Sequence, residues 1–424
     1  MENLFSSSFI FDDSSADEAK ICIVGVGGGG GNAINNMVAK GIHGVDFIAI
    51  NTDIQALTSN AAPVKIHAGK SLTKGLGAGA RASIGAEALD ENREQIEQAL
   101  RGFDMIFITA GMGGGTGTGG APVVASIARD LNVLSVAIVT RPFECEGRKR
   151  IMAADEGLAL LKKTVDTLIV IPNEKLLDIA DANTTLIEAF AKADEVLYNA
   201  TRGISDLITV PGLINLDFAD VKTTMSNGGT ALMGSAVGSG ENRAEKAAIE
   251  AISSPLLDGL SITGARNVLV NITAGRSLGI KEATTATSII QREAGDDVEV
   301  IFGTVIDETM GDELRVTVIA TGFERASETK PPRTASISLT DDNEVYHYKG
   351  EESLKNLDTP AYVRRAARAA VSITTEEENS TNTEDTSELY GKVRRLQVDD
   401  LKERGERIRK DDTETPAFLR KMMD

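Results

Sequence analysis

The chain has 424 residues and a formal net charge of −19 at pH 7. This length exceeds that of a single ordinary hydrophobic core, so it predicts two domains with connecting segments. The acidic balance disfavours nucleic acid and anionic lipid as the main partners, because the field of the whole protein would repel either polyanion. We therefore expect no nucleic-acid partner.

The cysteines and the N-terminus indicate the compartment. The two cysteines, Cys22 and Cys145, have no CxxC neighbour and no Cys or His at metal-ligand spacing, which predicts a reduced, cytoplasmic protein. Residues 1–18 contain acids but no Lys or Arg, so they lack the basic start of a signal peptide and are expected to form a flexible arm. No apolar run approaches the ~18 residues of a membrane span, so we expect no direct membrane insertion.

Short β-branched runs alternate with helix-length segments between residues 19 and 182. The runs are KICIVGV, VDFIAIN, FDMIFITAG, LSVAIVT and TLIVIP. Strands separated by helices predict βαβ units and a parallel, Rossmann-like sheet, with ligands at the carboxyl ends of the strands. We therefore expect residues 19–182 to form a nucleotide-binding α/β domain.

The next two segments are predicted from periodicity. Between Thr184 and Leu207 apolar residues recur every three to four positions, which is typical of a long amphipathic helix, here placed at 183–210. Residues 211–325 contain two helix-like segments and the strand-like runs NVLVNIT, VEVIFGT and LRVTVIAT. These strands are too few for a second nucleotide fold, so we expect a smaller α+β domain with a mixed sheet.

The remaining sequence is polar. Residues 326–411 are rich in Glu, Ser, Thr, Asn, Lys and Arg, which predicts a charged, disordered linker. Two similar segments stand out, DTPAYVRRA at 358–366 and ETPAFLRKM at 414–422. Each has an aromatic and an aliphatic residue between Thr-Pro-Ala and a basic pair, which is typical of a docking peptide. The first copy is either a second weak site that raises avidity or a remnant.

We expect residues 412–424 to be the partner-binding peptide. Its proline would rigidify the entry, and its aromatic and aliphatic side chains would be the anchors. The predicted contact residues are Pro416, Phe418, Leu419 and Arg420.

Two glycine-rich segments each follow a predicted strand and precede a predicted helix. The first, GVGGGGGNA at 25–33, satisfies GxGxxG. With Asp46 or Asp53 near the required spacing, it leaves an NAD-type oxidoreductase open as an alternative. The second, GMGGGTGTGG at 111–120, contains seven glycines and two threonines, which we expect no packed helix or strand to tolerate.

Such glycines let backbone N–H groups approach an anion closely, and a following helix N-terminus adds partial positive charge. Thr116 and Thr118 can add hydroxyl donors, and Pro122 is expected in the first turn of the following helix. The segment GLGAGA at 75–80 is a third candidate, and three such loops predict a polyphosphate. Neither main run ends in Gly-Lys-Ser/Thr, which excludes a Walker P-loop.

At these segments the sequence resembles the tubulin/FtsZ family of GTPases. GGGTGTG is the signature of that family, and GVGGGGGNA, NTD, PFECEGRKR and NLDFADV occur in the family's order. The peptide ETPAFLRK resembles the family's C-terminal partner peptide. The resemblance implies GTP or GDP as ligand, with Mg2+, and a cytoskeletal GTPase that polymerises head to tail into the bacterial division ring.

The resemblance also implies which residues bind the nucleotide. The glycine segments would bind it through Gly28, Gly29, Gly30, Gly31, Asn32, Gly115, Thr116 and Gly117. Glu146 and Arg150 are the implied ribose and phosphate contacts. Asp194 would read guanine, whose N1–H and amino group are adjacent donors. Phe190, one helical turn earlier, can pack against the purine, and Asn173 is a further candidate.

The catalytic residues implied by the resemblance, Asn215, Asp217 and Asp220, follow the central helix in NLDFAD. Because that helix extends ~20 Å beyond Asp194, these carboxylates are not expected to reach the γ-phosphate of their own chain. The resemblance implies that they enter the site of the next subunit, where they align and polarise water, so that hydrolysis requires assembly.

The resemblance further implies membrane-tethering and regulatory division proteins as partners of the C-terminal peptide, and a ring under the inner membrane. Two alternatives stay open. One is a non-polymerising dinucleotide-dependent oxidoreductase, although His43, His67 and His347 form no obvious hydride-transfer constellation. The other is a family relative whose filaments serve plasmid or shape functions.

Overall fold

A computed structural model describes residues 19–178, 184–210, 212–214, 216–257 and 260–323, which all belong to one compact unit. The predicted N-terminal arm, the linker and both Thr-Pro-Ala segments lie outside the described residues. So do Asn215 and the predicted partner contacts Pro416, Phe418, Leu419 and Arg420. The domain boundaries expected from the sequence stay predictions.

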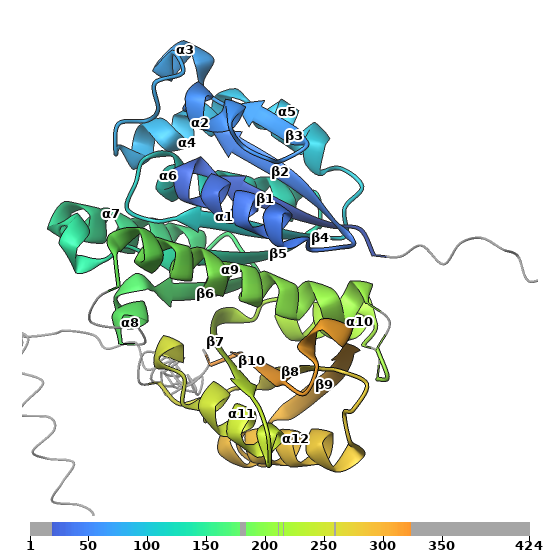
Figure 1. The fold of residues 1–424 in the computed structure, drawn as a ribbon. Coiled ribbons are helices and arrows are strands. Elements are labelled where there is room, and N and C mark those ends of the chain that lie inside the picture. Colours follow the sequence, from blue (N-terminus) through green and yellow to red (C-terminus); the bar gives the residue numbers. More distant parts are fainter. Residues whose placement is uncertain (1–18, 179–183, 211, 215, 258–259, 324–424) are drawn as a thin grey trace, which may run out of the picture. The chain divides into compact units, whose positions relative to one another are not determined.

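The described residues form strands and helices in alternation (Figure 1). The strands are β1 (Ile21–Val26), β2 (Val45–Asn51), β3 (Val64–His67), β4 (Met105–Gly111), β5 (Leu134–Arg141), β6 (Thr167–Pro172), β7 (Gly229–Gly238), β8 (Asn267–Ala274), β9 (Glu299–Ile306) and β10 (Leu314–Thr321). The helices are α1 (Gly27–Lys40), α2 (Ile54–Thr58), α3 (Lys70–Thr73), α4 (Ala82–Glu91), α5 (Arg93–Leu100), α6 (Thr116–Asp130), α7 (Arg148–Leu161), α8 (Asn173–Leu177), α9 (Leu186–Thr209), α10 (Phe218–Met225), α11 (Arg243–Ile252) and α12 (Ile280–Ala294). Short 3-10 turns are η1 (Glu144–Glu146), η2 (Pro255–Leu257) and η3 (Glu308–Met310).

The strands follow the order β3-β2-β1-β4-β5-β6-β7-β10-β8-β9. From β3 to β7 each neighbouring pair is parallel, whereas β10 runs antiparallel to both β7 and β8. Strands β8 and β9 are parallel again. The predicted fold class, a parallel Rossmann-like sheet, a long central helix and a smaller mixed-sheet part, is confirmed.

Both faces of the parallel strands are buried, because the side chains of a strand alternate between its two faces. In β1, Ile21 and Ile23 join the core under α1 and α9, whereas Cys22, Val24 and Val26 join the core under α4 to α7. This two-sided burial explains the uninterrupted apolar runs of the sequence. Helices α11 and α12 cover β8 and β10 with a third core.

The long helix α9 begins and ends close to the predicted bounds. Its first turn is closed by a capping box, in which the backbone N–H of Thr185 donates to the Glu188 carboxylate at 2.7 Å and the N–H of Glu188 donates to Thr185 Oγ1 at 3.3 Å. Near its other end, the Arg202 guanidinium donates to Asp307 before η3 at 2.7 Å. Helix α9 therefore contacts both the parallel strands and the C-terminal part.

Two expectations about the second glycine segment are wrong. Gly111 is the last residue of β4, and Thr116 to Gly120 already belong to α6, so this stretch is compatible with a strand end and a packed helix. Pro122 accordingly lies inside α6 rather than in its first turn. The reason is close packing on α4: a Cβ added to Gly119 would lie 1.9 Å from the carbonyl oxygen of Ala82.

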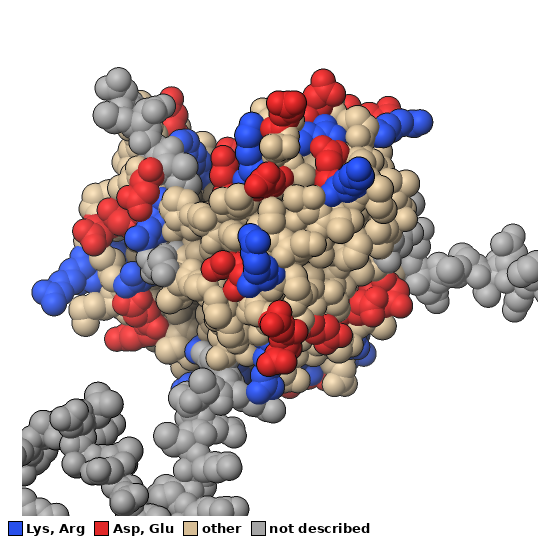
Figure 2. Space-filling model, turned by 90° about the horizontal axis from the view of Figure 1, so that it is seen from below, with Lys and Arg blue, Asp and Glu red and all other residues tan. Residues whose placement is uncertain are grey.

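The face on the side of α11 and α12 is shown in Figure 2. Basic and acidic side chains are interspersed there around a broad uncharged area. A nucleic-acid backbone requires a continuous positive surface, and this face does not offer one.

Candidate functional site

The two glycine segments lie side by side because β1 and β4, which precede them, are neighbours in the sheet. A Cβ on Gly29 would lie 2.9 Å from the backbone nitrogen of Gly111, and one on Gly27 would lie 2.8 Å from that of Gly117. Gly27 also has a φ of 73°, in the left-handed region that favours glycine. Any side chain at these positions would push the two segments apart.

The N-termini of α1 and α6 are therefore adjacent at one edge of the sheet. Neither helix has a side-chain hydrogen bond at its N-cap, so the first N–H groups keep their capacity to bind an anion. A Cβ on Gly28 or Gly114 would meet no atom within 4 Å, so these two glycines face open space. Both helix ends open into one cavity.

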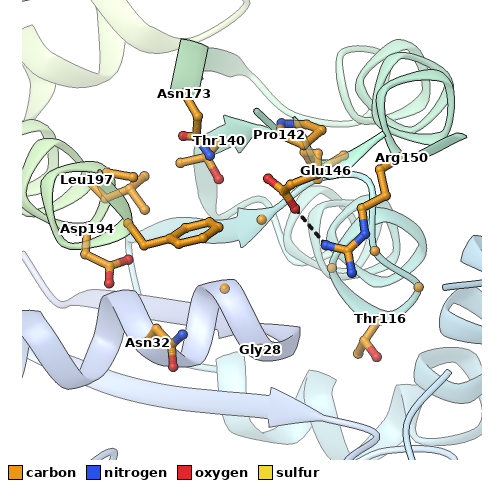
Figure 3. A pocket seen from close by; sticks show the side chains of 18 residues that line it. Gly28, Asn32, Thr116, Thr140, Pro142, Glu146, Arg150, Asn173, Asp194 and Leu197 are labelled. Carbon is orange, nitrogen blue, oxygen red and sulfur yellow. Dashed lines mark hydrogen bonds and ion pairs between the residues drawn. The ribbon is translucent and has the colours of Figure 1, made fainter. Parts of the chain in front are cut away.

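This cavity has a volume of about 430 Å³, which is within the range of small-ligand sites. It is lined by Gly28, Gly29, Asn32, Gly111, Met112, Gly114, Gly115, Thr116, Gly117, Thr140, Pro142, Glu146, Arg150, Asn173, Phe190, Ala193, Asp194 and Leu197 (Figure 3). The lining residues come from segments far apart in the sequence, which the sheet brings to the carboxyl ends of its strands.

All but two of the residues predicted to bind nucleotide line this cavity. The exceptions are Gly30 and Gly31. A Cβ on Gly30 would lie 2.3 Å from the carbonyl oxygen of Thr109, so this glycine allows α1 to pack on β4. The carbonyl of Gly31 accepts a hydrogen bond from the Asn60 side chain at 2.8 Å, and both residues line a separate, smaller cavity.

Gly111, Met112 and Gly114 also line the cavity and belong to the predicted second glycine segment, whereas four further lining residues were not predicted: Thr140, Pro142, Ala193 and Leu197. Two of them could have been found, because Thr140 and Pro142 lie at the carboxyl end of β5, where a parallel sheet binds its ligands. Ala193 and Leu197 lie on the same face of α9 as Phe190 and Asp194.

The threonines of the second glycine segment differ in their contacts. Thr116 lines the cavity, and its hydroxyl lies 2.6 Å from that of buried Thr52. Thr118 instead accepts a hydrogen bond from the backbone N–H of Gly113 at 2.8 Å and is fully buried. Thr116 therefore keeps its predicted place at the cavity, whereas Thr118 holds the loop in shape.

An ion pair lies on the wall of the cavity, between η1 and α7. One oxygen of Glu146 accepts a hydrogen bond from the backbone N–H of Phe143 at 3.0 Å, and the other accepts one from the Arg150 guanidinium at 2.7 Å (Figure 3). The Glu146 carboxylate is therefore held from two sides, and it orients an arginine that is half exposed.

The side of the cavity away from Thr116 and Arg150 carries oxygen acceptors (Figure 3). Burial raises the pKa of Asp194 from its ordinary value of 3.8 to about 6. Asn173 is buried, and its side-chain oxygen has no hydrogen-bond partner among the described residues. Such an acceptor is costly to bury unless a ligand supplies a donor. Phe190 is 40 % exposed beside them.

The third glycine segment, 75–80, does not line the cavity. A Cβ on Gly115 would lie 2.7 Å from the Cβ of Ala78, so this segment packs behind the second glycine segment. The cavity is therefore built by two glycine segments rather than three.

Two family models match most of the described chain. The model of the tubulin/FtsZ family GTPase domain matches residues 20–181, and that of the FtsZ family C-terminal domain matches residues 229–324. The solved structure of an empty FtsZ dimer from M. jannaschii is 46% identical, with a TM-score of 0.70 over 72% of this chain and 89% of that one. The chain belongs to the FtsZ family. An FtsZ mutant from the same organism is 47% identical, with a TM-score of 0.70 over 72% of this chain and 91% of that one.

The fold is shared more widely. GDP-bound CetZ1 from Haloferax volcanii is 22% identical and has a TM-score of 0.62, over 71% of this chain and 93% of that one. Membership of the FtsZ family makes this chain a cytoskeletal GTPase, and GTP or GDP is the ligand that its family implies. None of the described helices combines the length and the apolar composition of a membrane span.

The structure also weakens the oxidoreductase alternative. A second cavity, between the first glycine segment and the end of β2, has a volume of only about 70 Å³. A dinucleotide would require room for a nucleoside there. Asp53 caps α2 by accepting hydrogen bonds from the backbone N–H groups of Gln55 and Ala56, and Asp46 lies at the other end of β2.

The predicted catalytic carboxylates of this FtsZ-family chain lie outside its own cavity. Asp217 is the N-cap of α10, Asp220 lies in the first turn, and both are exposed. Figure 1 shows α10 beyond the C-terminal end of α9. At about 1.5 Å per residue, Asp194 and Thr209 are separated by about 22 Å along the helix axis. A single chain therefore does not bring these carboxylates to the cavity.

Proposed function

We propose that this protein binds GTP in the 430 Å³ cavity and hydrolyses it after head-to-tail assembly into the filaments of a cell-division ring. One observation carries the proposal: the two sides of the cavity differ in chemistry. One side offers two uncapped helix N-termini and Arg150, which suit a polyphosphate. The other offers the oxygens of Asn173 and Asp194, which suit the donor edge of guanine.

Base selection follows from these oxygens. The carboxylate of Asp194 accepts from N1–H and the exocyclic amine of guanine, while the Asn173 oxygen takes a donor that it lacks in the protein alone. Adenine presents an acceptor at N1, so its binding would leave the acceptors of the protein unpaired. Unpaired buried polar groups are the strongest means by which a site rejects a wrong ligand. Phe190 packs its exposed ring against the purine.

The phosphates bind at the glycine segments. Gly28, Gly29, Asn32, Gly115, Thr116 and Gly117 supply backbone and side-chain donors, as the family resemblance implied. Glu146 contacts the ribose, and Arg150 reaches the ribose or the phosphates. We place Gly30 and Gly31 in support of these groups, since neither lines the cavity and they contact Thr109 and Asn60 instead.

Assembly is supported by two separate groups of exposed apolar side chains. Leu177, Leu186 and Ile187 lie in α8 and the start of α9, near the cavity, whereas Leu213 and Ile214 lie shortly before Asp217. Contact between two different surfaces is heterologous, and it builds a filament when its rotation does not close. The FtsZ dimer from M. jannaschii is a relative that self-associates.

In such a filament Asp217 and Asp220 of one subunit reach the γ-phosphate bound by the next. Their carboxylates align and polarise the attacking water, so the site is complete only at a subunit junction. Asn215 of the same segment is proposed to assist them. Among the described residues, no three or more His, Cys, Asp or Glu side chains are arranged to hold a metal ion, so Mg2+ would need phosphate oxygens and water as ligands here. When bound, Mg2+ neutralises phosphate charge.

We further propose that the filaments form a ring in the cytoplasm under the inner membrane, where tethering and regulatory division proteins bind residues 412–424. The family membership and the ETPAFLRK segment support this placement. The bacterial origin of the ring stays a prediction, because the related structures named above come from M. jannaschii and Haloferax volcanii.

Ligand-dependent thermal unfolding tests the nucleotide assignment. A ligand that binds only the folded state raises the unfolding temperature. We expect GTP and GDP to raise it at concentrations at which ATP and NAD do not. Protection by NAD in the absence of protection by GDP would overturn the proposal.

A further inference from the structure

Phe143 is a buried residue next to the cavity, and its side chain does not line it. It is only 2 % exposed and immediately follows Pro142 of the cavity wall. Its ring meets that of Phe190 edge to face, with 5.2 Å between the ring centroids and 87° between the planes. This is a favoured geometry for an aromatic pair.

The backbone of Phe143 makes a second contact with the site. Its N–H donates to Glu146 at 3.0 Å, and the other oxygen of Glu146 accepts from Arg150 at 2.7 Å. Phe143 therefore contacts groups on both sides of the cavity: its ring packs on Phe190 of α9, and its N–H donates to Glu146 of η1. Along the chain these two elements are separated by α7, β6 and α8.

We propose that Phe143 is a positioning residue that fixes the Phe190 ring relative to Glu146, so that the base and the sugar of a nucleotide are bound in one geometry. This proposal rests on the proposed guanine-nucleotide site. Phe190 is 40 % exposed, so without a ring behind it the side chain gains rotamer freedom that binding must remove. Phe143 acts through Phe190 and does not itself line the cavity.

The test is a cycle of GDP affinities for the full chain with Phe143→Leu, Phe190→Leu and both substitutions, measured by calorimetry. Leucine keeps an apolar side chain and leaves the backbone N–H for Glu146. We expect Phe143→Leu to weaken GDP binding about three- to tenfold, as the loss of one aromatic pair predicts. Adding it to Phe190→Leu should have no further effect, because the pair is already lost.

Phe107→Leu is the matched control, since Phe107 is an equally buried phenylalanine of the core in β4. It should lower the unfolding temperature and leave GDP affinity unchanged. In hydrolysis, Phe143→Leu should raise KM for GTP and leave kcat unchanged. If Phe143→Leu does not fold, Phe143→Met takes its place.

Each outcome decides one question. A Phe143 variant that binds GDP as tightly as wild type overturns the positioning role. Equal weakening in the presence and absence of the Phe190 ring also overturns it, because Phe143 then acts in another way. If wild type itself binds no GDP, the proposed function fails instead.

Discussion

Asp217 Oδ1 accepts a hydrogen bond from the backbone N–H of Asp220 at 2.8 Å. The two proposed catalytic carboxylates are therefore tied together as the N-cap and the first turn of α10. The same contact gives Asp217 a structural role, because an N-cap side chain stabilises its helix. A substitution at this position changes the catalytic charge and the helix cap together unless the new residue can also cap.

Asp217→Asn separates the two roles, because asparagine caps a helix about as well as aspartate and carries no charge. We expect phosphate release to fall by about a hundredfold or more, as for loss of a group that acts on the attacking water. The unfolding temperature should stay near that of wild type. Asp217→Ala should in addition lose about 1 kcal/mol of stability with the cap.

Steady-state phosphate release and thermal unfolding check this prediction together. Asp46→Asn is the control, since Asp46 is an exposed aspartate at the far end of β2. Hydrolysis by Asp217→Asn at the wild-type rate would exclude a catalytic carboxylate at this position.

Asp194 is expected to make nucleotide binding depend on pH. Its folded-state pKa of about 6 lies above its ordinary value of 3.8, so the folded protein binds this proton more tightly than the unfolded chain does. Guanine requires the carboxylate, so GDP affinity should fall as the pH drops through 6. In the nucleotide-free protein, folding stability changes with pH in the opposite direction. It falls as the pH rises from about 4 to above 6, because the carboxylate then becomes charged in its partly buried position.

Asp194→Asn should therefore raise the unfolding temperature of the nucleotide-free protein at pH 7.5, and weaken GDP binding about 10- to 100-fold at the same pH. Protonation of the GDP phosphates affects both proteins equally. The ratio of wild-type affinity to variant affinity at each pH therefore reports on Asp194 alone. An affinity difference that stays constant between pH 5 and pH 8 would contradict the role of the carboxylate.

The apolar residues near the two ends of α9 are expected to control assembly. Leu213→Asp and Ile187→Asp place a charge on the two proposed contact surfaces, where desolvation of an unpaired charge opposes association. Both should abolish GTP-dependent pelleting and retain GDP binding by the isolated subunit. Leu160→Asp changes another exposed leucine, on α7 and outside the two proposed contact groups, and should pellet as wild type does. Normal pelleting of Leu213→Asp would exclude this contact.

Two glycines of the second segment are expected to respond in opposite ways to alanine. The Cβ of Gly119→Ala would lie 1.9 Å from the Ala82 carbonyl oxygen, so α4 and α6 must separate, at a cost of about 1–3 kcal/mol in unfolding free energy. The Cβ of Gly114→Ala meets no protein atom and faces the cavity. It should leave stability unchanged and weaken GTP binding. Equal stability of the two variants would contradict this division of roles.

The sequence predicts the parallel strands well, because a strand buried on both faces has an uninterrupted run of apolar residues, as in β1. It fails for β7, whose GTALMGSAVG is short of β-branched residues. Strand β7 exists because its backbone pairs with β6 on one side and β10 on the other. Pairing between distant segments is not visible in local propensity.

The candidate site shows the same limit. The family resemblance predicts that Gly28, Gly29 and Gly115 approach a ligand, and the structure places them at the cavity. It does not distinguish them from Gly30 and Gly119, whose missing side chains make room for Thr109 and Ala82. A glycine that admits a ligand and one that admits a neighbouring backbone look the same until the packing is known.

The central claim is that the catalytic site is completed by a second subunit, and hydrolysis by mixed subunits tests it most directly. Asp217→Asn keeps its cavity and lacks the charge, whereas Gly114→Ala keeps Asp217 and has an obstructed cavity. We expect each variant to hydrolyse GTP poorly alone, their mixture to regain activity, and wild-type specific activity to rise above a threshold protein concentration. A mixture no more active than the sum of its parts, together with wild-type activity independent of concentration, would show that one chain contains the whole site.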